Sequence, residues 1–408
     1  MINFEIDKRF IPEINIGMLG HVDHGKTTLV EAITGKWTDT HSEEIERGIT
    51  IRLGYADATF YKCKNCGSYS TSNKCMKCFS EAEPTRTVSF VDAPGHESLM
   101  ATVLTGSALM DGAVLVISAT EKCPLPQTRE HLTTLEVVGI KHIVIVQNKI
   151  DLVSKERIKE SYKEIKEFVK GTIAESAPII PVSAQQKINI EYVIQAIEEF
   201  IPTPKRDENK PVKMFVARSF DINKPGTEIE KLVGGVVGGS IVQGVLRVGD
   251  EVILVPGIRI DGSFKKITTK VVSLEKAGKK LEQAGPGGLL GVMTQLDPYL
   301  TKADSLAGNL LCLPDNVPKE RNELEIEAKL LERVVGTKEM EGMQEIKLNE
   351  ILMINVGPCR SVGTVTSVKG NRIRLSLRMP VYADDGERVV LSRQIMGRWR
   401  LIGYGRII

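Results

Sequence analysis

The 408-residue sequence has no apolar run that approaches the roughly 20 residues needed to cross a bilayer. Its first nine residues carry mixed charge and contain no signal-peptide core. Cysteine is scarce: there are seven, an odd number, and four of them fall in one short cluster. This argues against a disulfide framework. From these absences we expect a cytoplasmic protein with no membrane partner.

The sequence also lacks a large net charge, a low-complexity segment and a repeat of fixed period. The formal net charge is +2, so the composition as a whole indicates no polybasic protein. The charge is uneven, however. From Val356 to the end of the chain there are ten Lys or Arg residues and three acids, which predicts a local basic face.

The length predicts two to four domains. Up to about residue 204, short apolar runs alternate with helix-like stretches, and the Val/Ile-rich runs are typical of strands buried on both faces. This alternation predicts a doubly wound α/β domain with a mostly parallel sheet. We expect strands at 14–19, 88–91, 113–117, 143–147 and 179–182, and helices at 27–34, 127–138, 155–169 and 190–200.

A proline-rich, charged segment at 201–207 ends this alternation. Beyond it, short strand-like runs are punctuated by glycines, which predicts a β-barrel. A second break lies near 313–318, and a similar texture resumes after it. The predicted domains are therefore 1–204 for the α/β domain, 205–318 for a first barrel and 319–408 for a second.

The stretch Gly20-His21-Val22-Asp23-His24-Gly25-Lys26-Thr27 has the form G-x-x-x-x-G-K-T. It lies between a predicted strand and a predicted helix, which is the setting that a phosphate-binding loop requires and that an accidental glycine turn would lack. Lys26 is expected to reach the β- and γ-phosphates, and the Thr27 hydroxyl to bind Mg²⁺.

Two later motifs follow predicted strands. In Asp92-Ala93-Pro94-Gly95, the carboxylate can hold Mg²⁺ through water, and the Gly95 N–H can sense a γ-phosphate. In Asn148-Lys149-Ile150-Asp151, the Asp151 carboxylate can accept hydrogen bonds from the guanine N1–H and 2-amino group, which favours GTP over ATP, while Lys149 covers the base. The stretch that follows the last predicted strand completes the base pocket: Ser183, Ala184 and Gln185.

Three further residues are candidates for switching and catalysis. Asp23 lies inside the phosphate loop, where a carboxylate is either solvated or a ligand of a second Mg²⁺. Thr50, in Arg47-Gly48-Ile49-Thr50-Ile51, can cap Mg²⁺ and make this loop a switch that orders with GTP. His96 follows the Asp92 turn directly, and we predict that it is the catalytic residue that orients the attacking water.

The cysteine cluster has the spacing Cys63-x2-Cys66-x8-Cys75-x2-Cys78. Two facing C-x-x-C pairs can supply a tetrahedral set of four thiolates that suits Zn²⁺, and four free thiols are the alternative. Because four protein ligands close such a site, we predict a structural zinc ribbon inserted at about residues 60–82.

Together the phosphate loop, Asp92-Ala93-Pro94-Gly95-His96 and Asn148-Lys149-Ile150-Asp151 resemble the translational GTPases of the elongation factor Tu group, whose second-domain signature is similar to 234–252. Within this group the chain resembles the gamma-subunit family of archaeal and eukaryotic translation initiation factor 2. The stretches that carry this closer resemblance are the zinc ribbon, 47–56, 218–221, 330–336 and 397–403.

The resemblance implies an α/β P-loop GTPase domain with an inserted zinc ribbon, followed by two β-barrel domains. It implies GTP or GDP, one Mg²⁺ with a second as a hypothesis, and a structural Zn²⁺ as cofactors. The residues that match the family's nucleotide contacts are Asp23, His24, Gly25, Lys26, Thr27, Thr28, Asn148, Lys149, Asp151, Ser183, Ala184 and Gln185. Thr27 and Thr50 match the primary Mg²⁺ ligands, Asp23 and the Gly48 carbonyl match a second Mg²⁺ site, and the four clustered cysteines match the zinc ligands. Gln185 departs from the family, in which many members carry Leu.

The function implied is the hydrolysis of GTP to GDP and phosphate, coupled to delivery of initiator methionyl-tRNA to the small ribosomal subunit. The implied partners are the tRNA, that subunit, and the alpha and beta subunits of a heterotrimer. Two alternatives stay open: an elongation-type or selenocysteine-type carrier of aminoacyl-tRNA, and a GTP-binding scaffold subunit with negligible hydrolysis of its own. The basic stretch from Arg360 onward fits either tRNA phosphates or a solvated barrel face.

Overall fold

The computed structural model describes residues 7–39, 50, 52–96, 99–331 and 344–408. These residues form two compact units, one ending at Pro204 and the other beginning at Lys205. Each unit is described by itself. Among the described residues, no helix combines the length and the apolar character needed to span a membrane.

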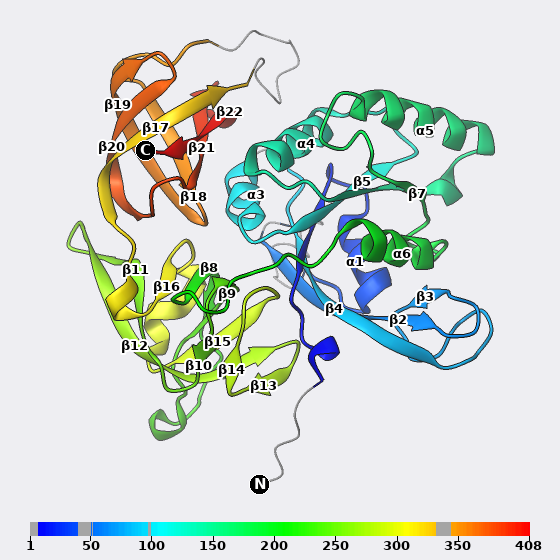
Figure 1. Ribbon diagram of the computed structural model, residues 1–408, viewed down its shortest axis with the longest axis horizontal. Helices are drawn as coiled ribbons and strands as arrows, with labels where there is room; N and C mark the ends of the chain where they lie inside the picture. The colour runs from blue at the N-terminus through cyan, green and yellow to red at the C-terminus, as the bar shows by residue number, and fades with distance from the viewer. Residues whose placement is uncertain (1–6, 40–49, 51, 97–98, 332–343) are drawn as a thin grey trace. The chain divides into compact units, whose positions relative to one another are not determined.

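The first unit is built around a seven-stranded sheet with the strand order β3-β2-β4-β1-β5-β6-β7 (Figure 1). From β4 to β7 the neighbouring strands are parallel, whereas β2 runs antiparallel to β4 and β3 antiparallel to β2. The central strands are fully buried because they consist of continuous apolar runs. The strands are β1 (Asn15–Leu19), β2 (Gly54–Cys63), β3 (Tyr69–Ser70), β4 (Ala82–Asp92), β5 (Gly112–Ser118), β6 (Ile143–Asn148) and β7 (Ile179–Pro181).

Helices cover this sheet. Buried side chains of α1 and α6 share one hydrophobic core with the strands, so these two helices pack on the same face, while α3 packs against α4 and α4 against β5. The predicted helices are found within one residue of their expected ends, whereas β2, β3 and α3 were not foreseen from the sequence. The helices of this unit are η1 (Lys8–Phe10), α1 (Lys26–Thr34), α3 (Met100–Ser107), α4 (Pro126–Val138), η3 (Ile150–Leu152), α5 (Lys155–Val169) and α6 (Ile190–Phe200).

The hairpin of β2 and β4 extends beyond the rest of the sheet and carries the cysteine loops at its far end (Figure 1). Cys63, the last residue of β2, pairs with Ala82, the first residue of β4. At the other end of the same hairpin, Gly54 pairs with Asp92. The predicted strand 88–91 is therefore only the inner part of an eleven-residue strand, because the outer part has too few apolar residues to be recognised by hydrophobicity.

The second unit contains two closed barrels. In the first, the sheet order β11-β16-β8-β9-β15-β12 closes through the pairing of β11 with β12. Its strands are β8 (Lys213–Phe220), β9 (Val236–Gln243), β11 (Glu251–Ile260), β12 (Ser263–Lys276), β15 (Leu290–Thr294) and β16 (Leu310–Cys312). Shorter elements accompany them: η4 (Ile229–Lys231), β10 (Leu246–Arg247), β13 (Lys279–Leu281), β14 (Gln283–Ala284) and η5 (Pro298–Asp304).

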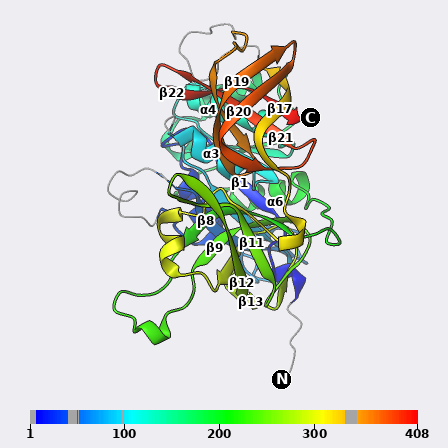
Figure 2. The same ribbon diagram turned by 90° about the vertical axis from the view of Figure 1, so that its left-hand side faces the viewer.

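The second barrel follows the short helix η6 (Pro314–Asn316) and closes in the order β17-β20-β19-β18-β21-β22. Figure 2 shows β17, β20 and β19 side by side, in the order in which they pair. Each barrel has its own apolar core. The strands are β17 (Glu320–Leu330), β18 (Ile351–Val356), β19 (Cys359–Lys369), β20 (Arg372–Tyr382), β21 (Arg388–Ile395) and β22 (Arg398–Ile407).

The predicted class, an α/β domain with an inserted ribbon followed by two barrels, is confirmed. The exact domain boundaries at 204/205 and 318/319 stay predictions. The elements that flank them are α6 and β8 for the first boundary, and η6 and β17 for the second.

Candidate nucleotide-binding and metal sites

The phosphate loop joins the end of β1 to the start of α1, where the chain turns through Gly20 to Gly25. The backbone N–H of Gly20 donates a hydrogen bond to Nδ1 of His131, a buried residue of α4, over 2.8 Å. The ammonium group of Lys26 donates to the His21 carbonyl over 3.0 Å. The loop is therefore held from both sides while its N–H groups at the start of α1 remain available to an anion.

A pocket of about 370 Å³ opens beside this loop. It combines residues of the phosphate loop, of the segment after α1, and of two later motifs. The lining residues are Val22, Asp23, Gly25, Lys26, Thr27, Thr28, Trp37, Asp39, Thr50, Gly95 and Lys149. Because several of these side chains carry oxygen donors or ammonium groups, the pocket suits a charged ligand bound together with a cation.

Oxygen atoms from four segments meet at one end of the pocket. The Thr27 hydroxyl donates to Oδ2 of Asp92 over 2.8 Å and lies 3.2 Å from the Thr50 hydroxyl oxygen. The Thr38 hydroxyl donates to the same Asp92 oxygen over 2.7 Å. The Thr50 hydroxyl donates to Oδ2 of Asp39 over 3.2 Å. This group of five residues is called the oxygen cluster below.

Burial dominates the electrostatics of the oxygen cluster. Asp92 is completely buried, and burial raises the pKa of its carboxyl to about 6 although Lys26 and the two threonine hydroxyls oppose the rise. Burial also lowers the pKa of Lys26, against the attraction of Asp92, Asp39 and Asp23. Oδ1 of Asp92 is buried and has no hydrogen-bond partner among the residues that the structure describes.

The oxygen cluster fits Mg²⁺. Hydroxyl and carboxylate oxygens are the hard donors that this ion prefers, and neighbouring ligands at about 2.1 Å in an octahedron lie about 3 Å apart. The Thr27 and Thr50 oxygens are separated by 3.2 Å. The buried, unsatisfied Oδ1 of Asp92 offers a further acceptor for a cation or for its water ligands.

The base side of the site is organised by Asn148, at the end of β6. Its side-chain N–H donates to the His24 carbonyl over 2.9 Å, and its Oδ1 accepts the Ala184 N–H over 3.0 Å. Asn148 thus connects the phosphate loop to the Ser183–Gln185 stretch. The His24 ring is itself buried between the Val116 carbonyl (3.1 Å) and Glu121 (3.0 Å), and burial lowers its pKa to about 4.

The remaining predicted residues lie as follows. Asp23 and Thr28 line the pocket, and Gly95 lines it opposite Lys26. His96, the next residue, is exposed. At the base side, Ser183 is buried, whereas Asp151 and Gln185 are exposed. Gly48 lies outside the described residues. The structure thus brings six of the twelve predicted nucleotide residues to the lining of one pocket, and the individual role of each residue stays a prediction.

Sequence reasoning missed four residues of this region: Trp37, Thr38, Asp39 and His131. The first three follow α1 in a segment that matches no motif. The fourth, His131, lies buried beneath the phosphate loop, and no motif in the sequence indicates this position. The one available signal was the polarity of Thr38 and Asp39 directly before the Thr50 loop, because polar residues in a switch segment often contact the metal or its ligands.

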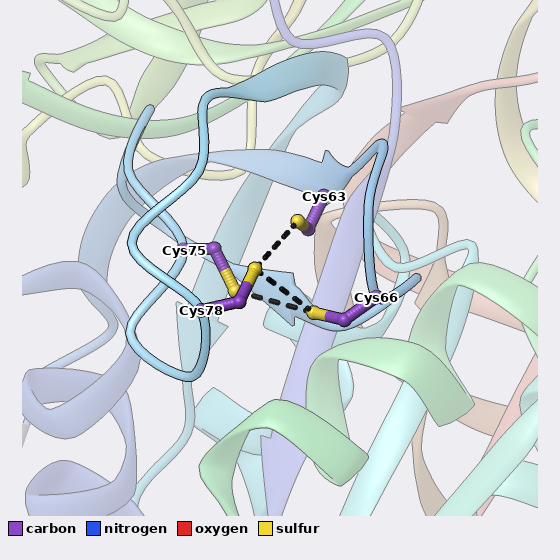
Figure 3. A group of neighbouring side chains, drawn as sticks. All are labelled: Cys63, Cys66, Cys75 and Cys78. Carbon is purple, nitrogen blue, oxygen red and sulfur yellow. Dashed lines mark hydrogen bonds between the residues drawn. The ribbon is translucent and has the colours of Figure 1, made fainter.

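The four clustered cysteines converge at the end of the β2–β4 hairpin (Figure 3). Their sulfur atoms all lie within 4.8 Å of one another, with Cys63 to Cys78 and Cys66 to Cys75 both at 3.4 Å. Tetrahedral zinc with Zn–S bonds of about 2.3 Å requires sulfurs about 3.8 Å apart. The cluster therefore has the spacing that a structural Zn²⁺ needs.

The local backbone favours the thiolate at Cys75 and Cys78. At Cys66 a backbone hydrogen bond from Ser68 also lowers the pKa, but hydrogen bonds with the other three cysteines and desolvation together outweigh it, so the pKa of Cys66 is raised instead. Hydrogen bonds from the Ser80 side chain and backbone, together with Cys63, lower the pKa of Cys78 to about 6, and the backbone N–H groups of Cys78 and Lys77 lower the pKa of Cys75. Because zinc binds the thiolate form, such a set of donors fits the metal. Cys123, Cys312 and Cys359 are buried apart from this cluster.

Family models match three parts of the chain. Residues 12–203 match the elongation factor Tu GTP-binding domain, and residues 234–312 match elongation factor Tu domain 2. Residues 322–407 match the C-terminal domain of initiation factor eIF2 gamma. The first unit is therefore a translational GTPase domain, and the chain is a GTPase.

Among solved structures, the chain is similar to a bacterial selenocysteine-specific elongation factor, with a TM-score of 0.75 and 23% identity over 97% of this chain and 58% of that one. It is also similar to the elongation factor SelB of Methanococcus maripaludis in complex with a GTP analogue, with a TM-score of 0.72, 23% identity and 79% of that chain covered. At this identity the similarity establishes the fold.

Curated relatives are much closer in sequence. Translation initiation factor 2 subunit gamma of Pyrococcus furiosus is 58% identical over 97% of both chains. The proteins of the same name from Methanocaldococcus jannaschii and Methanothermobacter thermautotrophicus are 56% and 58% identical over 97% of this chain and 97% and 98% of their own. With the nucleotide pocket, the cysteine cluster and the two barrels in place, the chain belongs to the translation initiation factor 2 gamma-subunit family of translational GTPases.

Proposed function

We propose that the chain binds initiator methionyl-tRNA in its GTP-bound state, delivers it to the small ribosomal subunit, and is released when GTP is hydrolysed. The observation that carries this proposal is the 58% identity over 97% of the chain with proteins named translation initiation factor 2 subunit gamma. The word subunit in that name also supports alpha and beta partners in a heterotrimer. We place the protein in the cytoplasm, where initiation requires it.

Nucleotide binding follows from the pocket. The Lys26 ammonium group lies in the pocket with the Thr27 hydroxyl, which suits the β- and γ-phosphates of GTP. At the base side, Asp151 is the acceptor for the guanine N1–H and 2-amino group, and Lys149 covers the ring. The Asn148 side-chain amide is hydrogen-bonded to the phosphate loop and to Ala184, so it fixes the distance between the phosphate and base sites.

The oxygen cluster would hold Mg²⁺ through Thr27 and Thr50, with Asp92 acting on its water ligands. The ion supplies positive charge that neutralises the phosphate oxygens during phosphoryl transfer. Asp23, which lines the pocket, and the Gly48 carbonyl are the proposed ligands of a second Mg²⁺. A carboxylate beside phosphates is tolerable where a cation lies between them.

We assign to His96 the role of positioning the water that hydrolyses GTP. His96 is exposed and directly follows Gly95, which lines the pocket. Its imidazole can orient a water molecule by hydrogen bonding. The γ-phosphate would be sensed by the Gly95 N–H and by Thr50, so that loss of the phosphate releases the segments that carry them. This change would alter the surface that holds the tRNA.

Filter binding with initiator and elongator methionyl-tRNA tests the proposed cargo. In the presence of GTP and the partner subunits, we expect clearly tighter binding of the initiator tRNA, and equal affinities would overturn the assignment to initiation. Preference for another aminoacyl-tRNA would favour an elongation-type or selenocysteine-type carrier.

Single-turnover GTP hydrolysis on small ribosomal subunits tests the catalytic role of His96. The His96→Ala variant is expected to hydrolyse GTP roughly 100-fold more slowly, within the range of general acid–base and positioning effects, while GDP affinity is retained. Equal rates for the variant and the wild type would remove His96 from the mechanism. Negligible hydrolysis by both would favour the scaffold alternative.

A further inference from the structure

The zinc ribbon contains two nearly repeated segments. The first knuckle is Lys62-Cys63-Lys64-Asn65-Cys66-Gly67-Ser68, and the second knuckle is Lys74-Cys75-Met76-Lys77-Cys78-Phe79-Ser80. Their backbones match. The N–H of the first cysteine donates to the carbonyl of the serine over 2.9 Å in both, and the N–H of the sixth residue donates back to that cysteine over 3.0 and 2.9 Å. A residue that differs between the two knuckles is therefore not required by their shared backbone turn.

The sixth position has a left-handed backbone in both knuckles. Gly67 has φ of 70° and Phe79 has φ of 58°. Glycine adopts this region at little cost, whereas a bulky side chain is strained there. Since Gly67 produces the same turn in the first knuckle, the zinc ligands do not require an aromatic residue at this position.

Packing does not explain Phe79 either. The residue is 79% exposed, and Met76, three residues earlier in the same turn, is 76% exposed. The first knuckle has Lys64 and Gly67 at these positions. The second knuckle thus displays two apolar side chains to solvent at a cost in backbone strain, and strain that the fold does not need is an indication of function.

Two lysines precede Phe79 in the second knuckle, Glu81 follows it opposite Lys74 in a backbone bridge, and the base of the knuckle is anchored. Nζ of Lys77 lies 3.4 Å from a Glu191 carboxylate oxygen and 4.9 Å from the ring centre of Tyr192, so that it attaches the knuckle to α6. Lys74 is exposed at the start of the knuckle. In the first knuckle, Lys64 is paired with Glu83 over 2.5 Å.

We propose that the second knuckle binds single-stranded RNA, with an unpaired base stacked on Phe79, Met76 beside it and Lys74 on the phosphate backbone. An exposed aromatic ring interleaved with lysines suits unpaired bases, because every base offers a π-face and every nucleotide a phosphate. Phe and Met alone would also suit a protein interface, but lysine is depleted there, so the lysines beside Phe79 favour RNA over a protein partner. The choice of RNA rests on the proposed role in initiation, and the site itself does not require tRNA delivery.

The test uses the full-length, zinc-loaded, GDP-bound chain and a short fluorescein-labelled oligouridylate, with its duplex as the comparison. Fluorescence anisotropy gives the affinity. Methyl-labelled methionine gives a local NMR signal, and the Met76 resonance can be assigned among the twelve methionines with Met76→Leu. Phe79→Gly installs the residue of the first knuckle, and Ser68→Ala in the first knuckle is the control.

We expect the single strand to shift the Met76 resonance and the duplex to leave it in place. Phe79→Gly should weaken single-strand binding roughly tenfold, within the range of one lost base stack, and abolish the Met76 shift, while zinc content, GDP affinity and thermal stability are retained or improved. Ser68→Ala should bind as the wild type does.

An unchanged Met76 resonance at saturating RNA, or equal affinity of Phe79→Gly and the wild type, would overturn the RNA site. Loss of zinc or a lower melting temperature in Phe79→Gly would show that Phe79 serves the fold. Because no tRNA is used, these results are independent of whether the chain selects initiator tRNA.

Discussion

Replacing Asp92 by asparagine should remove a pH-dependent loss of stability from the metal-free, nucleotide-free protein. The carboxyl group is completely buried, and burial raises its pKa from 3.8 to about 6. The charged groups that face it are Lys26, which lowers the pKa, and Asp39, which raises it. Without a cation, the ionised form of Asp92 is therefore an unfavourable group in the folded state.

The size and sign of the effect follow from the two pKa values. The rise of the Asp92 pKa from 3.8 to about 6 means that folding disfavours the ionised carboxylate by about 3 kcal/mol relative to the protonated carboxyl. Between about pH 4 and pH 6 the folded protein binds more protons than the unfolded chain, so wild-type stability falls as pH rises through this window and then levels off. The amide of the Asp92→Asn variant does not titrate in this range, so the variant lacks this loss.

Asparagine retains an oxygen that can accept from Thr27 and Thr38. Its NH₂ group takes the place of Oδ1, which has no hydrogen-bond partner in the described structure. Burying this NH₂ group without an acceptor costs about 1–3 kcal/mol of stability at every pH. The test is therefore the change of the stability difference with pH rather than its value at one pH.

Urea unfolding in the presence of EDTA measures this difference. The chain has two tryptophans, so a Trp399→Phe background leaves Trp37, which lines the nucleotide pocket, as the reporter of the GTPase domain. Between about pH 4 and pH 7, the free energy of unfolding of Asp92→Asn should gain about 3 kcal/mol relative to its parent. Thr38→Val removes a hydrogen bond that lowers the Asp92 pKa, so it should enlarge the pH-dependent loss.

A stability difference between Asp92→Asn and its parent that stays constant over this pH range would refute the reasoning. It would mean that water or rearrangement solvates the Asp92 carboxylate. The gain in stability should be accompanied by weaker Mg²⁺-dependent binding of GTP, since the amide cannot supply the charge that a cation's water ligands require.

Three further predictions concern the same domain. Asp39→Asn should weaken the binding of a non-hydrolysable GTP analogue several-fold in Mg²⁺ but leave it unchanged in EDTA, because Asp39 accepts the Thr50 hydroxyl. Equal losses in both buffers in a titration with a fluorescent form of this analogue would contradict this. Gly95→Ala places a methyl group 2.6 Å from Lys26 Nζ and 2.7 Å from the Val22 nitrogen. It should therefore reduce GTP affinity at least tenfold more than GDP affinity. An equal loss for both nucleotides in stopped-flow binding kinetics would contradict this. Cys66→Ser should reduce bound zinc from one ion per chain to nearly none and lower the melting temperature by several degrees, and full zinc content by elemental analysis would reject the four-thiolate site.

The nucleotide site could be predicted from sequence where chain order alone brings residues together. Asp92 and Asn148 each end a parallel strand, and the carboxyl ends of parallel strands meet at one edge of the sheet. The motifs therefore required no knowledge of packing. The same holds for the four cysteines, whose spacing defines two facing turns.

The parts that sequence reasoning missed depend on contacts between distant segments. Thr38 reaches Asp92 across 54 residues of sequence, and His131 reaches Gly20 across 111. Neither contact leaves a local signature, because the sequence around a threonine or histidine does not show whether its side chain will contact a distant segment. The outer part of β4 was missed because its polar residues lie on a hairpin that is only partly buried.

The strand pairs that close each barrel were also beyond the sequence. Glycine-punctuated runs predicted strands, but the pairing of β11 with β12 and of β17 with β22 depends on register and on a bulge after Leu254. These are properties of the assembled sheet rather than of any one segment.

Strand β4 has a zinc cluster at one end and the phosphate-sensing turn at the other. Ala82 packs with Cys63 and Cys75, and Asp92 joins Thr27 and Thr50 about 33 Å away along an extended strand. Strand β4 is paired with β2 along its length and with β1 from Ser89 to Asp92, and an extended strand held in this way can hardly be stretched. A displacement of Asp92 along the strand axis would therefore be passed to the second knuckle, because one continuous strand joins the two.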